Sequence, residues 1–205
     1  MSTKKEAVPI AKKIVEDVLK GEKNLSEVYD ALTAKKEAIR YPNAIAMQTL
    51  GEEIPERIYP KFDYFVDLTK SDNAFHRAIG LNAIADLTKV DTEMKFEKIF
   101  DKYFDLLDDK SVMVARQLTL VSGKIIKYKQ NLREKIVNKL LDVDKTHHDK
   151  DRRALIWGDI IEAFNMNFEE LKDKKKVLEF VKKQLNSASP TTVKRAKAFL
   201  KKWGK

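Results

Sequence analysis

The chain lacks cysteine, and it lacks any long stretch free of charged residues. It has no cysteine among its 205 residues, which excludes disulfides, thiolate zinc sites, iron–sulfur clusters and a cysteine nucleophile. The longest stretch without a charged residue is 41–51, far short of the roughly 20 apolar residues that a transmembrane helix needs. The first 20 residues alternate apolar and charged side chains, unlike a secretory signal. We therefore expect a soluble, cytoplasmic protein with no membrane contact.

Glycine and proline are also few, at six and five residues. Apolar residues recur at intervals of three and four, and no segment shows a convincing strand pattern, so the sequence predicts an all-α fold. The helices are expected near 6–20, 26–40, 43–51, 57–70, 74–89, 93–107, 112–128, 131–142, 150–165, 169–186 and 190–202.

Several helix ends are marked by specific residues. Gly21 is the residue type expected just past a helix C-terminus. Pro42 predicts that the second helix ends before it, because the residue preceding proline is pushed out of helical geometry. Asn43 is then expected to cap the third helix. Ser189 followed by Pro190 predicts the start of the last helix.

One short pattern recurs along the chain. Segments centred on Arg77, Arg116, Arg153 and Arg195 align with one another at spacings of 39, 37 and 42 residues, and a degenerate copy at Asn43 precedes Arg77 by 34. A period near 40 with two helices in each period is typical of stacked helical hairpins. The alignment places Leu81, Leu120, Trp157 and Phe199 in one column, which is expected to be buried.

The copies resemble HEAT repeats, a family with an aspartate in the turn of each hairpin and an arginine early in its second helix. The matching aspartates are Asp72, Asp109, Asp149 and Asp151. The resemblance implies one domain over 1–205, a right-handed α-α superhelix of about five hairpins plus an N-terminal helix. It also implies a ladder of aspartates and arginines, in which the turn aspartate caps the second helix. Armadillo-like stacking is the alternative arrangement.

The excess positive charge lies at one end. The net charge is +9 overall, and residues 172–205 hold twelve basic and two acidic residues, a net of +10. The lysines at 172–176 and along 194–202 are expected to form a solvated stripe. Such a stripe serves solubility, or it binds phosphates non-specifically.

Stacked hairpins form an extended concave surface from their second helices, here expected at 43–51, 74–89, 112–128, 150–165 and 190–202. The exposed positions predicted to contact a partner are Arg77, Lys124, Lys127, Arg152 and Lys194. The first hypothesis is a non-enzymatic scaffold that binds a protein or peptide partner. The second is a nucleic-acid-binding protein with a basic concave surface.

The sequence also contains a histidine-rich turn. His147, His148 and Asp149 are followed by Asp151, and together with His76 and Asp159 they give the order of ligands found in metal-dependent phosphohydrolases. The two adjacent histidines fall in a polar turn between repeats, and a histidine ligand normally needs an oriented outer shell. The favoured interpretation is therefore that the chain binds no metal and no cofactor.

An enzymatic alternative rests on Trp157 and Asp159. Some HEAT-like alkylpurine DNA glycosylases use tryptophan, aspartate and arginine around the lesion, and Arg152, Arg153 and Trp203 complete such a set here. The resemblance implies that Asp159 stabilises positive charge on the sugar. However, residues two apart on a helix point about 200° apart, which favours Trp157 as a packing residue. No catalytic residue is assigned outside this alternative.

A cluster of aromatic residues follows helical spacing. Phe96, Phe100, Tyr103 and Phe104 lie on one stripe at i, i+4, i+7 and i+8. This spacing favours a buried stripe over a platform for stacking nucleic-acid bases.

Overall fold

The computed structural model describes residues 4–204, and every regular element within them is helical. The all-α prediction is thereby confirmed. Among the described residues, none of the helices combines the length and the apolar character needed to cross a bilayer. The chain divides into two compact units, one ending at Glu93 and the other beginning at Met94, and each is described by itself.

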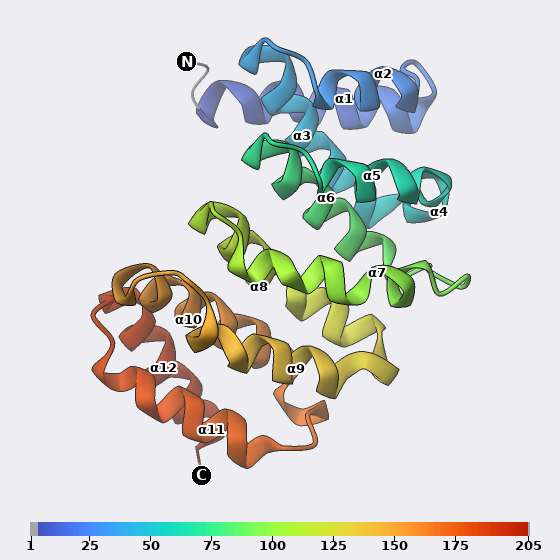
Figure 1. Cartoon of the computed structure of the whole chain (residues 1–205). Helices are drawn as coiled ribbons and strands as arrows, with labels where there is room; N and C mark the ends of the chain where they lie inside the picture. The colour runs from blue at the N-terminus through green and yellow to red at the C-terminus, as the bar shows by residue number, and fades with distance from the viewer. Residues whose placement is uncertain (1–3, 205) are drawn as a thin grey trace. The chain divides into compact units, whose positions relative to one another are not determined.

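The first unit is built around α3 and α6. Its helices are α1 (Lys4–Lys20), α2 (Leu25–Leu32), α3 (Glu37–Glu53), α4 (Pro55–Ile58), α5 (Phe62–Leu68) and α6 (Ala74–Leu87), with a 3-10 turn η1 (Tyr59–Lys61). Helix α3 packs against α1, α2 and α6, and α5 packs against α6 (Figure 1). A methyl group at Gly80 would lie only 2.6 Å from the carbonyl oxygen of Phe65, so this glycine permits the close contact of α5 and α6.

The second unit contains three longer helices in contact, α8 (Val112–Tyr128), α10 (Lys150–Asn165) and α12 (Pro190–Trp203). Helix α10 packs against both α8 and α12 (Figure 1). The connecting helices are α7 (Lys95–Phe104), α9 (Arg133–Leu141) and α11 (Lys174–Lys183), with 3-10 turns η2 (Asp105–Asp108), η3 (Gln130–Leu132), η4 (Asp142–Lys145), η5 (Phe168–Glu170) and η6 (Gln184–Asn186). The predicted bounds of α8 and α10 are confirmed.

The predicted helix ends are confirmed where a cap is local. Gly21 follows α1 with a φ of +80°, and the amides of Gly21 and Glu22 bond back to the carbonyls of Val18 and Asp17. This is the Schellman arrangement, which favours glycine because its φ is positive. Ser189 caps α12 by accepting a hydrogen bond from the amide of Thr192 at 3.3 Å.

The predicted break at Tyr41 and Pro42 is wrong. Helix α3 runs through both residues, and Pro42 is buried within it. Proline removes one hydrogen bond to the residue four positions earlier, which here is Ala38 in the first turn of the helix, where the backbone is least constrained. Asn43 therefore caps nothing: its side chain donates to the carbonyl of Ile39 inside the helix.

The predicted core column is only half correct. Leu81 and Phe199 are buried, but Leu120 is 40 % exposed. Trp157 is half-buried, and its indole N–H donates to Asp144 Oδ1 at 3.0 Å. The four-aromatic stripe of α7 is fully buried as predicted. At the end of the described chain Trp203 packs on Phe168 and donates to Asn165.

Candidate functional site

The side chains considered as a metal set from the sequence have separate roles in the structure. Asp149 caps α10 by accepting from the amide of Arg152. Asp159 is fully buried between arginines. His76 belongs to the first unit, where its Nδ1 lies 3.2 Å from Ser71 Oγ.

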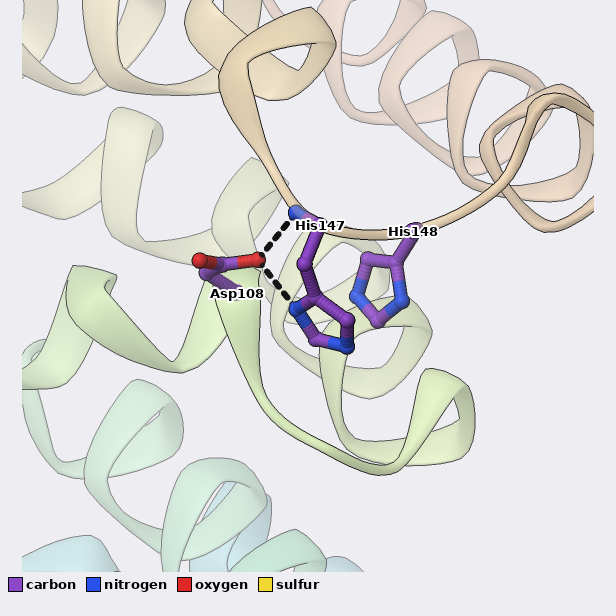
Figure 2. Close-up of side chains that lie close together, drawn as sticks. All are labelled: Asp108, His147 and His148. Carbon is purple, nitrogen blue, oxygen red and sulfur yellow. Dashed lines mark hydrogen bonds and ion pairs between the residues drawn. The ribbon is translucent and has the colours of Figure 1, made fainter.

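The histidine-rich turn has a different carboxylate partner. Oδ1 of Asp108, at the end of η2, accepts from the backbone amide of His147 at 2.7 Å and lies 2.6 Å from its Nδ1 (Figure 2). His148 lies beside His147, with ring centroids 4.3 Å apart. Sequence reasoning missed Asp108 because it is 39 residues away. That separation equals one period of the repeat, so the repeat spacing could have indicated that Asp108 lies near His147.

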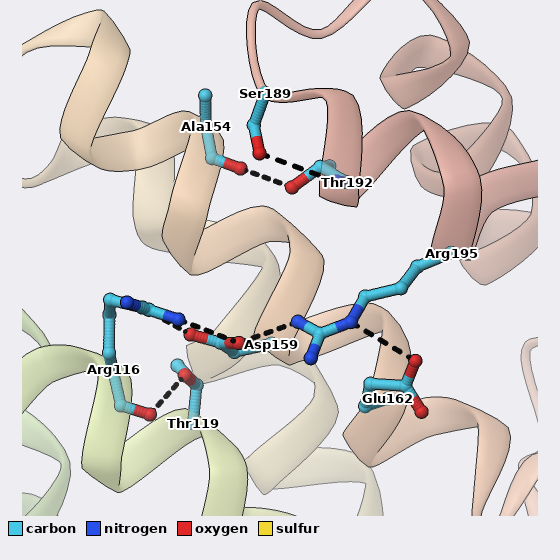
Figure 3. Close-up of polar contacts among 8 residues, drawn as sticks. All are labelled: Arg116, Thr119, Ala154, Asp159, Glu162, Ser189, Thr192 and Arg195. Atoms are coloured by element: carbon cyan, nitrogen blue, oxygen red, sulfur yellow. Dashed lines mark hydrogen bonds and ion pairs between the residues drawn. The ribbon is translucent and has the colours of Figure 1, made fainter.

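Asp159 lies at the centre of a row of charges that joins α8, α10 and α12. Its Oδ2 accepts from Arg116 Nε and its Oδ1 from the terminal nitrogen of Arg195, both at 2.6 Å (Figure 3). Arg195 Nε also lies 3.2 Å from Glu162 Oε1. The side chain of Asp159 is 0 % exposed, whereas those of Arg116 and Arg195 are 39 % and 27 % exposed.

This row does not match the catalytic alternative. Both carboxylate oxygens of Asp159 already accept charged hydrogen bonds, and the group has no access to solvent or to a bound base. Trp157 points instead to Asp144 in η4, as expected for residues two apart on a helix. The exposed residue one turn before Asp159 is Leu155, which lacks the ring that would grip a distorted duplex. Asp159 therefore acts as an ion-pair bridge among three helices.

The predicted partner-binding residues fall into two groups. Arg77 is only 4 % exposed, and its guanidinium donates to the carbonyls of Ser71 and Asp72 at 2.7 and 3.0 Å. The expectation that Arg77 is an exposed contact residue is therefore wrong, because the side chain folds back onto the turn before α6. It stabilises that turn.

The other four residues lie on the second unit. Lys127 on α8, Arg152 on α10 and Lys194 on α12 are exposed, and Lys124 on α8 is half-buried. With 100° of rotation per residue, Lys127 lies about 20° and Lys124 about 80° from Arg116 around α8, whereas Lys194 lies about 100° from Arg195 around α12. We call the surface of α8, α10 and α12 that carries these four residues the second-helix face.

Apolar side chains are exposed between these cations. Met113 and Leu120 on α8 are 45 % and 40 % exposed, and Leu155 on α10 is 38 % exposed. Leu155 and Arg152 line a shallow groove that continues to the start of α12 at Pro190 and Thr191. The second-helix face therefore combines positive charge with accessible aliphatic surface.

The charge of the second unit is strongly positive. From Met94 onward the sequence holds 27 basic and 16 acidic residues, a net of +11, whereas the part up to Glu93 has a net of −2. A long-range field of this sign attracts negatively charged partners. Most of this excess lies in residues 172–205, which carry a net of +10, whereas residues 94–171 hold 15 basic and 14 acidic residues.

No family model matches the chain, and no curated protein matches it.

Proposed function

We propose that the chain is a HEAT-like scaffold, built from stacked helical hairpins in a right-handed superhelix. The arginine-centred copies support this, because they fall at corresponding early positions in α6, α8, α10 and α12. The packing of α10 on both α8 and α12 supports it within the second unit. In such an arrangement the second-helix face is the concave, ligand-binding side.

On this scaffold, the proposed ligand is an acidic segment of a protein or peptide. Exposed apolar residues among the cations carry this choice, namely Met113, Leu120 and Leu155. Phosphate binding requires cations alone, whereas protein interfaces bury methionine, arginine and aliphatic side chains together. The cysteine-free composition fits a reducing compartment, so the cytoplasm is the proposed location.

The ion-pair row prepares the face for binding. Asp159 fixes Arg116 and Arg195 across three helices, so these guanidiniums lose little freedom when a partner docks. A pre-organised surface binds more tightly than a flexible one of the same area. Binding then depends on many shallow contacts, and no chemical step is proposed.

The test is a quantitative pull-down from an extract of the source organism. A face variant combines Lys127→Glu, Arg152→Glu and Lys194→Glu, and a matched control combines Lys175→Glu, Lys182→Glu and Lys183→Glu on α11. Both variants change the net charge equally. The proposal predicts that one acidic partner is recovered with wild type and control and is lost with the face variant. Equal loss in both variants, or retention in the face variant, contradicts it.

Duplex DNA is the second candidate ligand, and the net charge of +11 in the second unit favours it. A gel shift at low and moderate salt tests it, because phosphate binding weakens steeply as salt rises. Measurable, salt-sensitive binding that the face variant abolishes supports DNA as the ligand, and no binding at low salt rejects it. Release of an alkylated base by wild type, lost in an Asp159→Asn variant that circular dichroism shows to be folded, would support the glycosylase alternative, and no release by wild type rejects it.

A further inference from the structure

The histidine-rich turn holds three potential metal ligands that come from two different loops. Asp108 ends η2, before α8, and His147 and His148 lie between η4 and α10. One ligand atom from each of the three side chains lies within 4.8 Å of the other two. Figure 2 shows the carboxylate and both imidazole rings gathered in the space between the loops.

His148 is the observation that points to a ligand. Its side chain is only 2 % exposed, yet neither ring nitrogen has a hydrogen-bond partner among the described residues. Buried polar atoms in folded proteins are nearly always hydrogen-bonded or bound to a ligand. A solvent-facing histidine would need no such explanation, but this ring is enclosed and held next to a second imidazole.

Asp108 and His147 supply the remaining parts of a site. The carboxylate accepts a hydrogen bond from the backbone amide of His147, and its Oδ1 lies 2.6 Å from His147 Nδ1, so one ion could bind both atoms once Nδ1 carries no proton. Asp108 and His147 are each about half exposed, at 52 % and 49 %, so an ion can enter from solvent. His148 forms the buried side of the proposed site.

We propose that Asp108, His147 and His148 bind one divalent transition-metal ion, with Zn²⁺ as the expected occupant. Two imidazoles and one carboxylate are preferred by zinc, whereas calcium and magnesium take oxygen ligands. Three protein ligands leave a fourth position for water. Ligand atoms in a zinc site lie about 3.3 Å apart, from bond lengths near 2.0–2.1 Å, so binding would separate Asp108 Oδ1 and His147 Nδ1, which now lie 2.6 Å apart. The bound ion would link two loops that are 39 residues apart in the sequence.

Zinc binding to tag-free, chelator-treated protein tests this site. Titration of Zn²⁺ against a chromophoric chelator is expected to show one equivalent bound, with no competition from Mg²⁺ or Ca²⁺. Co²⁺ is expected to give the visible absorption of a low-coordinate site. Asp108→Asn and His147→Ala change exposed residues and should preserve the fold, and each is expected to weaken binding at least tenfold, in line with the loss of a ligand or its orienting partner.

Two further variants make the test specific. His148→Ala is expected to abolish binding, with circular dichroism used to check its fold. His76→Ala and Asp149→Asn are matched controls, one histidine and one aspartate outside the cluster, and both are expected to bind as wild type does. Absence of stoichiometric binding by wild type overturns the site. So does unchanged binding in both Asp108→Asn and His147→Ala, or equal weakening in the controls. The result is independent of the proposed partner.

Discussion

At the scale of single residues, the structure depends on a few buried charges that are matched by neighbours from other helices. Asp159 is the clearest, since it is fully buried and bridges Arg116 and Arg195. Removing one member of a buried ion pair leaves the other charges uncompensated, which typically costs more than the intact pair contributes.

The first prediction is that Asp159→Asn destabilises the fold by about 3 kcal/mol, because two guanidiniums lose their shared counter-charge. Glu162→Gln is the control. It removes a carboxylate that is 42 % exposed and bound to the same Arg195, and it is expected to cost under about 1 kcal/mol. Urea denaturation of both variants measures the difference. Equal, small effects would show that Asp159 contributes no more than a surface charge.

The second prediction concerns pH. Glu97 is paired with Lys129, whose side chain is only 7 % exposed. Burial acts to raise the pKa of Glu97, but hydrogen bonds from Lys129 and Asn131 more than offset it, and the pKa lies below its ordinary 4.5. A depressed folded-state pKa gives stability that is present above the unfolded value and is lost as pH falls through the folded value.

Glu97→Gln should therefore be less stable than wild type at pH 7, and the gap in unfolding free energy should narrow as the pH falls below about 4.5. Urea denaturation from pH 7 to pH 3 measures this gap, with the exposed Glu169→Gln as the control. A gap that stays constant over this range would mean that the ionised form of Glu97 is not what stabilises the fold.

At the scale of helices, glycine residues allow two neighbouring helices to pack closely against each other. A methyl group at Gly158 of α10 would lie 2.4 Å from Thr192 Oγ1 on α12, and that hydroxyl already donates to the carbonyl of Ala154 at 2.6 Å. The third prediction is that Gly158→Ala destabilises the second unit by about 1–3 kcal/mol through overpacking.

A double variant separates crowding from other effects of this change. Thr192→Ala alone loses a buried hydrogen bond, but in combination with Gly158→Ala it removes the clash. The pair is therefore expected to be less destabilising than the sum of the two single variants. Thermal unfolding of the four proteins measures the coupling. Strict additivity would show that α10 and α12 are not held apart by this contact.

The positions of α8, α10 and α12 could be predicted from the sequence. Each follows a serine or an aspartate that stands just before its first turn. The break expected at Pro42 failed, because burial of Pro42 in α3 outweighs one lost hydrogen bond. The prediction that Arg77 is an exposed contact residue was also wrong. Helical phase places its Cα, but the long side chain turns back to backbone carbonyls, which no spacing rule predicts.

Two features of the candidate sites depended on contacts between distant segments. Asp108 joins His147 across 39 residues, and Arg116 joins Asp159 across 43. The repeat period predicts that such segments are neighbours, but it does not specify which side chains meet. Leu120 was assigned to the core by alignment, yet it is exposed, because equivalent positions of successive repeats need not be equally covered.

At the scale of the whole molecule, charge is divided unequally between the two units, +11 from Met94 onward and −2 before it. An acidic partner is therefore expected to associate with the second unit, and more slowly as ionic strength rises, because steering by net charge is screened over about 10 Å at 0.1 M salt. The exposed aliphatic residues of the second-helix face add a contribution that salt does not screen.

Lysine footprinting of the chain with its captured partner tests the central proposal most directly. Acetylation of each exposed lysine is quantified by mass spectrometry with and without the partner. The proposal predicts that Lys127 and Lys194 become protected while Lys175 and Lys182 on α11 react as before. Unchanged reactivity at Lys127 and Lys194, with protection on α11 instead, would place the partner elsewhere and contradict the assignment of the second-helix face.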